Sequence, residues 1–175
     1  MKKQVKTKES FKKPTFRKRT LSRLIAIQIF YQFEFHDQKI PLEEIKNSVI
    51  DNYVLEQEED ISSYRKRIDL NLLETLLAGV NLGMDQLDHD IAGFLKDDWD
   101  LNKLPDVMLY ILRLGAFELK YTLDVPVKVV LGEYVDIAAS FYENKKVTFV
   151  NATLENIAKN HRADELQKAK TTKNV

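Results

Sequence analysis

Apolar residues recur at three- and four-residue steps along most of the chain, which is the spacing of one face of an α-helix. The strongest runs cover residues 21–35, 70–95 and 104–121. The first run is apolar on most sides, so we expect a central helix with neighbours around it. The second run keeps its period for more than six turns, and Gly79 and Gly83 within it indicate either close packing or a break.

Three shorter segments complete the predicted helices. Pro41 suits a first helical position, and apolar residues follow it at helical steps as far as Tyr53. Residues 127–141 begin with β-branched side chains that would also suit a strand, but the length of this segment favours a helix. Residues 149–159 form the predicted last helix.

The segments between and after these helices are polar. Residues 55–67 are rich in charge without a sustained apolar period, so we expect a mobile connection there. Trp99 lies in a short polar connection, and the residues beyond Asp164 are predicted to be a frayed tail. We therefore divide the chain into a disordered basic extension, a single helical domain and a polar tail. The predicted boundaries are 1–15, 16–162 and 163–175.

The pattern predicts an all-α fold. No segment alternates convincingly between apolar and polar residues, the hairpin dipeptides Asn-Gly and Asp-Gly are absent, and the chain has only five glycines. No repeat of fixed period occurs, which argues against a solenoid. We expect two small antiparallel three-helix groups packed on each other.

Composition narrows the possible classes of function. With 175 residues, 44% of them apolar, the chain is long enough for one hydrophobic core. It has no cysteine, which excludes disulfides and thiolate chemistry and fits a cytoplasmic protein. No apolar run approaches the roughly 18 to 20 residues that a membrane span requires, so no membrane partner is expected.

The formal net charge of zero conceals an uneven distribution. Residues 1–23 contain ten Lys or Arg and a single acid, Glu9, which leaves the rest of the chain acidic. A cluster of cations of this kind is typical of a phosphate-binding surface. We interpret the lysines up to Lys13 as part of a solvated tail. The cations that run into the apolar helix are predicted to bind phosphates: Arg17, Lys18, Arg19 and Arg23.

The chain offers little that would support catalysis. His36, His89 and His161 are far apart and lack a two-histidine metal spacing. Asp88 and Asp90 point in diverging directions on a helix, so we expect them to be solvated. Neither a phosphate loop of the Walker type nor a Gly-x-Ser-x-Gly elbow is present. We therefore expect no enzyme activity, no metal and no cofactor.

What remains is a pattern suited to RNA, with arginines at a helix start and aromatic residues that could stack on bases. One base–aromatic stack contributes about 1–3 kcal/mol. Tyr31, Phe141 and Phe149 lie on apolar helical faces, where an aromatic residue is more often part of the core.

Three motifs occur in a characteristic order. Clustered basic residues precede an apolar helix that contains Gln-x-x-Tyr at residues 28–31. Ile-Leu-Arg-Leu-Gly-Ala-Phe-Glu-Leu covers residues 111–119. Asp-Val-Pro-Val-Lys-Val at residues 124–129 is followed by Phe-Val-Asn at residues 149–151. With this order and spacing, the chain from about Arg17 to Ala158 resembles the NusB family.

This resemblance implies two three-helix groups and a function without catalysis. It implies binding of the boxA element, a single-stranded part of ribosomal leader RNA, jointly with the small-subunit ribosomal protein NusE in the transcription elongation complex. It also places seven residues on the RNA: Arg17, Lys18, Arg19, Arg23, Tyr31, Phe141 and Phe149. We add Lys145 as a predicted RNA contact, although its position can be acidic in relatives. Glu118 matches a family glutamate that either faces NusE or braces the core with Arg113.

The chain also departs from the family pattern, mainly around the segment that would face RNA. Met108-Leu109 replaces an acidic and a basic residue, and Gly132 replaces a common asparagine. Ala152 stands in place of glycine, and Thr148 in place of a frequent basic residue. These differences leave open a NusB-fold interaction module that has lost specific RNA recognition. A third possibility, the RNA-binding domain that precedes some RNA methyltransferases, would require a catalytic domain that this sequence lacks.

Overall fold

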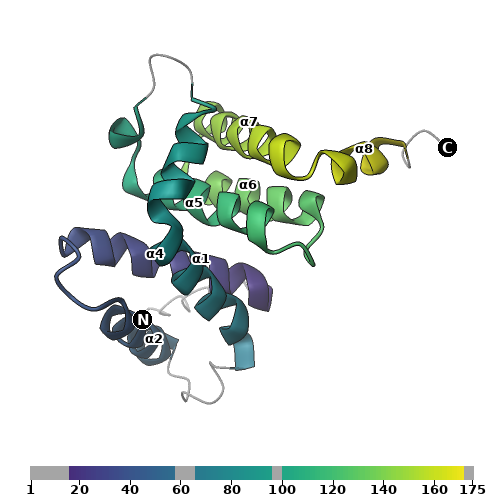
Figure 1. The fold of residues 1–175 in the computed structure, drawn as a ribbon. Helices are drawn as coiled ribbons and strands as arrows, with labels where there is room; N and C mark the ends of the chain where they lie inside the picture. Colours follow the sequence, from purple (N-terminus) through teal and green to yellow (C-terminus); the bar gives the residue numbers. More distant parts are fainter. Residues whose placement is uncertain (1–15, 58–65, 96–99, 172–175) are drawn as a thin grey trace, which may run out of the picture.

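The computed structural model describes residues 16–57, 66–95 and 100–171, and within these ranges it contains helices and no strand (Figure 1). The all-α prediction is therefore confirmed. The elements are α1 (Lys18–Phe35), α2 (Leu42–Gln57), α4 (Leu70–Ala92), the short 3₁₀ helix η1 (Leu101–Lys103), α5 (Asp106–Tyr121), α6 (Val127–Phe141), α7 (Asn144–His161) and α8 (Ala163–Thr171).

The helices form the two predicted groups. Helix α1 packs on α2 and α4, and α5, α6 and α7 pack on one another. Helix α5 joins the groups because it also packs on α1 and α4 (Figure 1). Every residue from Tyr110 to Leu119 is buried, so α5 is the centre of the protein.

Two glycines allow helices to approach closely at this centre. A Cβ atom on Gly79 of α4 would lie 2.1 Å from ring carbons of Phe117 on α5. A Cβ atom on Gly115 of α5 would lie 2.8 Å from a methyl carbon of Leu154 on α7. Gly83 has nothing within 4 Å of such an atom, and α4 continues through it without a break. Of the two glycines singled out in α4, only Gly79 marks close packing.

Two helix boundaries differ from those predicted. Helix α2 continues to Gln57, so the connection starts later than expected, and its residues 58–65 lie outside the described ranges. Helix α7 begins at Asn144, five residues before Phe149. Its first turn is polar and mostly exposed, so apolar periodicity did not reveal it. The expectations for residues 1–15 and for Trp99 also fall on residues that are not described.

The prediction of a frayed tail beyond Asp164 is wrong as far as Thr171, because these residues belong to α8. The turn before α8 is fixed by Arg162, which is buried and donates a hydrogen bond of 2.9 Å to the carbonyl oxygen of Val125. Glu165 accepts a hydrogen bond of 2.8 Å from the backbone N–H of Val127 and so caps the start of α6. Arg162 also contacts the Glu165 carboxylate. These polar contacts, which sequence periodicity does not report, order the start of α8.

No helix in the described part of the chain is both long enough and apolar enough to cross a membrane.

Candidate nucleic-acid interface

The start of α1 presents the cations that were predicted to bind phosphates. Arg17 is the residue before the first turn, and Arg17, Lys18 and Arg19 are all exposed. Arg19 lies 3.8 Å from a carboxylate oxygen of Asp69 and remains 44% exposed. The unpaired N–H groups and the dipole at a helix N-terminus add to this positive charge. The arrangement suits an anionic ligand.

Arg23 occupies a different environment, because its side chain is only 1% exposed. Its Nε and Nη2 atoms donate to the two oxygens of Glu118 over 2.7 and 2.8 Å, and its Nη1 donates to Glu133 over 3.1 Å. Burial alone would lower the pKa of Arg23, but the hydrogen bonds and charge of Glu118 raise it above its ordinary value. The guanidinium therefore stays charged, and each of its three nitrogens donates to a carboxylate. We do not retain Arg23 as a phosphate contact, since its side chain is buried and already paired with carboxylates.

Glu118 is the centre of this buried network. Besides Arg23, it accepts a hydrogen bond of 2.7 Å from the hydroxyl of Tyr134 on α6. Burial and the charge of Glu118 raise the pKa of Tyr134 well above its ordinary value, so this hydroxyl keeps its proton. Of the two roles left open for Glu118, bracing the core is the one observed. Its partner is Arg23 and not Arg113.

Arg113 instead pairs with Asp88 of α4 through two hydrogen bonds of 2.7 Å. Asp90 accepts hydrogen bonds from Lys120 over 2.6 Å and from Gln86 over 2.8 Å. The expectation that Asp88 and Asp90 are merely solvated is therefore wrong. Both carboxylates therefore connect α4 to α5 through ion pairs. Within the described ranges, no group of His, Asp or Glu residues is arranged to hold a metal ion.

The predicted aromatic residues lie at comparable positions on two helices. Helix α5 runs antiparallel to α1 and to α6, so α1 and α6 share one general direction. Tyr31 follows Arg23 by eight residues on α1, and Phe141 follows Glu133 by eight residues on α6. The Arg23–Glu133 contact thus lies about 12 Å along each helix from an exposed aromatic ring. Tyr31 is 41% exposed and Phe141 is 50% exposed.

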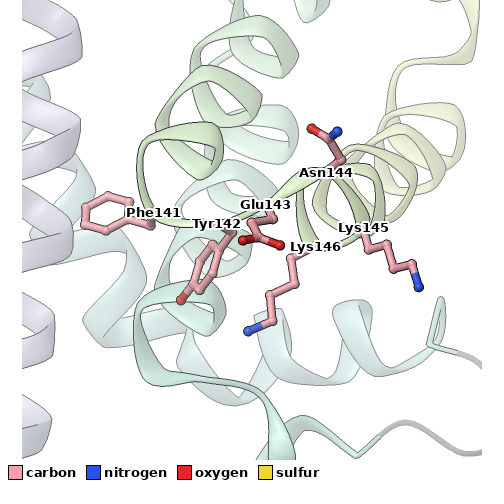
Figure 2. A pocket seen from close by; sticks show the side chains of 6 residues that line it. All are labelled: Phe141, Tyr142, Glu143, Asn144, Lys145 and Lys146. Atoms are coloured by element: carbon pink, nitrogen blue, oxygen red, sulfur yellow. The ribbon is translucent and has the colours of Figure 1, made fainter.

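The turn between α6 and α7 contains an open pocket of about 750 Å³. Figure 2 shows its lining side chains, with Phe141 extending to one side and Lys145 to the other. Lys146 lies between them, and its Nζ atom is 5.1 Å from the centre of the Tyr142 ring. The residues that line the pocket are Phe141, Tyr142, Glu143, Asn144, Lys145 and Lys146.

A second pocket, of about 320 Å³, adjoins this turn. Phe149 is half-buried and lines it together with Phe94, which follows the end of α4. Lys145 lines both pockets, so the two pockets lie next to each other at this residue. Sequence reasoning included Lys145 and missed Tyr142 and Lys146. The adjacent lysines of the turn were the available signal for Lys146, whereas no motif or spacing in the sequence singled out Tyr142.

The exposed cations of α1 and the aromatic and basic residues of this turn are of the kinds that bind single-stranded nucleic acid. Cations bind the phosphates, and exposed rings offer faces on which unpaired bases stack. We call these residues the candidate RNA surface: Arg17, Lys18, Arg19, Tyr31, Phe141, Tyr142, Lys145, Lys146 and Phe149.

Comparison with known proteins agrees with the resemblance seen in the sequence. The model of the NusB family matches residues 20–159. The chain is similar to the transcription antitermination protein NusB of Sinorhizobium fredii, with 38% identity over 146 residues, 83% of this chain and 89% of that protein. It is also similar to the protein of the same name from Rhizobium meliloti, with 36% identity over 147 residues, 84% of this chain and 89% of that protein.

Solved structures show the same fold. T. maritima NusB superimposes with a TM-score of 0.67 at 26% sequence identity, covering 90% of this chain and 99% of that one. A structure of NusB and NusE in complex with dsRNA contains a chain that matches with a TM-score of 0.61 at 21% identity, covering 80% of this chain and 95% of that one. The sequence match extends over most of the chain and is accompanied by the same arrangement of helices. The chain therefore belongs to the NusB family.

Proposed function

We propose that this chain is a transcription antitermination factor that binds boxA-type leader RNA of ribosomal RNA operons jointly with the ribosomal protein NusE. Family membership is the observation that carries this proposal, because relatives that match along nearly their whole length are named transcription antitermination proteins. A NusB of the same fold has been solved together with NusE and RNA. In this proposal the chain acts by binding within the transcription elongation complex, in the cytoplasm, and catalyses no reaction.

We assign RNA binding to the candidate RNA surface. Arg17, Lys18 and Arg19 are exposed and can neutralise phosphates without breaking a buried contact. Tyr31 and Phe141 are both exposed residues whose rings could stack on unpaired bases. Phosphate contacts supply affinity without sequence preference, whereas contacts with unpaired bases supply preference. We therefore expect selectivity to arise from the turn between α6 and α7 more than from the start of α1.

The experiment that tests this proposal is RNA binding measured by fluorescence anisotropy. The probes are a boxA-like single strand and a scrambled strand of the same composition, each with and without NusE. We expect tighter binding of the boxA-like strand, and a larger difference between the strands when NusE is present. Equal affinity for the two strands under both conditions would refute the proposal.

A second candidate function is motivated by the family positions that differ on α6 and α7, on either side of the turn. Gly132 and Ala152 are exposed, and Thr148 bonds within its own helix to the carbonyl oxygen of Asn144. Fewer polar groups near the turn would weaken base recognition while leaving the fold intact. Equal affinity for both RNA strands, with NusE binding retained, would support a NusB-fold interaction module in place of an RNA-binding factor.

A further inference from the structure

The first turns of α1 are attached to the rest of the protein on two sides. On the side of α4, the Ser22 hydroxyl donates to the carbonyl oxygen of Asp69 and accepts from its N–H, both over 2.9 Å. On the side of α6, one oxygen of Glu133 accepts hydrogen bonds from Thr20 over 2.7 Å and from Arg23 over 3.1 Å. These attachments follow directly after the exposed cations of α1.

Glu133 differs from the buried Glu118, although both pair with Arg23. Glu118 is completely buried and binds Arg23 with both of its oxygens. The side chain of Glu133 is 18% exposed, and it gathers donors from two successive turns of α1 on a single oxygen. The core therefore retains its central ion pair without Glu133, and Arg23 still lies 5.7 Å from the centre of the Tyr134 ring on α6. The hydrogen bond from Thr20 to α6, by contrast, depends on Glu133.

This link lies between the two parts of the candidate RNA surface. Arg17 to Arg19 immediately precede Thr20, while Phe141 lies eight residues beyond Glu133, about 12 Å further along α6. A strand that contacts both parts gains affinity from the second contact only when the spacing of the two parts is fixed. The contacts of Glu133 with Thr20 and Arg23 help to fix that spacing.

We propose that Glu133 is a positioning residue for RNA, which holds the cations at the start of α1 at the distance from the α6–α7 turn that one RNA strand requires. This inference rests on the proposed function, because it takes RNA as the ligand of both parts. Glu133 itself carries a negative charge and does not bind the phosphates. Its effect passes through Thr20 and Arg23.

The test compares Glu133→Gln and Thr20→Val with the unmodified chain, using a boxA-like strand and the two halves of that strand as separate probes. Glu133→Gln removes a negative charge, which by itself would strengthen RNA binding. Positioning predicts the opposite, a loss of about tenfold in affinity for the full strand, the effect of losing one charge-assisted hydrogen bond. The affinity for each half strand stays within about twofold of the unmodified chain, because a half strand contacts only one part.

Two matched variants control for changes unrelated to positioning. Glu155→Gln makes the same change of charge on α7, where Glu155 lies 3.9 Å from Lys159. Thr75→Val removes a hydroxyl that bonds only within its own helix, to the carbonyl oxygen of Asn71. Neither variant should weaken binding of the full strand, and thermal melting of all four variants shows whether they are folded.

Unchanged affinity of Glu133→Gln for the full strand would overturn the inference. An equal loss for the full strand and for both halves would also overturn it, since that result indicates general damage to the fold. A different result would refute the proposed function: the unmodified chain would bind boxA-like and scrambled strands with equal affinity. The comparison between full and half strands still decides the role of Glu133 in that case.

Discussion

The junction of α1, α5 and α6 and the turn between α6 and α7 contain the same kinds of residue but differ in burial. At the junction, Arg23, Glu118 and Tyr134 are buried and hydrogen-bonded to one another. At the turn, Phe141 and Lys145 are exposed around an open pocket. A cation and an aromatic ring that are buried together stabilise the fold, whereas the same pair at the surface is available to a ligand. Residue type alone therefore does not identify the binding surface of this family member.

The largest expected effect comes from the junction. Arg23→Ala leaves the buried Glu118 carboxylate without its main partner, so we expect the free energy of unfolding to fall by about 3–5 kcal/mol. Urea denaturation measures this loss. Lys39→Ala is the control, because Lys39 and Asp37 form an ion pair whose side chains are each 76% exposed, and its loss should leave stability unchanged within error. A small effect of Arg23→Ala would mean that the contrast between the two regions is false.

The two glycines of α4 should respond to substitution with changes in stability of opposite sign. Gly79→Ala places a methyl group against Phe117 and should lower the free energy of unfolding by about 1–3 kcal/mol through overpacking. Gly83→Ala meets no atom within 4 Å and should raise it by up to about 1 kcal/mol, because alanine favours a helix. Denaturation of the two variants in parallel checks both signs. Equal stabilisation by both substitutions would contradict the close packing of α4 on α5.

The turn should show the reverse pattern, with loss of binding and little loss of stability. Phe141→Ala is expected to weaken binding of a boxA-like strand by about 1–3 kcal/mol, the contribution of one base stack, as measured by anisotropy. Its free energy of unfolding should change by no more than about 0.5 kcal/mol, since Phe141 is an exposed residue outside the core. Tyr121→Ala removes an aromatic residue of similar exposure at the opposite end of the α5–α6 pair and should leave RNA binding unchanged.

The smallest effect concerns the pair of Asp90 with Lys120, whose burial lies between those of the two regions. Burial alone would raise the pKa of Asp90, but hydrogen bonds from Lys120 and Gln86 and the charge of Lys120 lower it below the ordinary value of 3.8. The folded state therefore binds this proton less readily than the unfolded state, and the stability that Asp90 confers is lost as the pH falls below about 4. Asp90→Asn should make the fall in urea midpoint between pH 6 and pH 3 shallower. An equally steep fall would argue against a stabilising role for the pair.

The helical architecture could be predicted from the sequence because apolar periodicity records burial along each helix. Helix α1 has α2, α4 and α5 around it, as its apolar run predicted, but the sequence did not single out α5 as the centre of the protein. The two glycines of α4 indicated either close packing or a break, and the structure shows close packing at Gly79. The start of α7 and the whole of α8 were missed, because the first turn of α7 is polar and α8 begins with the polar contacts of Arg162 and Glu165. Periodicity carries no information about such contacts.

The candidate RNA surface was only partly predictable. Clustered charge identified the start of α1, but a one-dimensional pattern does not say that Arg19 is exposed while Arg23, one helical turn later, is buried. The partners of Arg23 lie 95 and 110 residues away along the chain. Tyr142 and Lys146 became candidates only when the folded turn placed them around a pocket.

The most direct test of this account is the dependence of RNA binding on salt concentration, for the unmodified chain and for the double variant Arg17→Ala/Arg19→Ala. Each lost phosphate contact with a single strand reduces the slope of log affinity against log salt by about 0.7, so the double variant should reduce it by about 1.4. The account predicts this flatter slope with an unchanged free energy of unfolding. An unchanged slope would contradict the claim that the exposed start of α1 binds RNA phosphates.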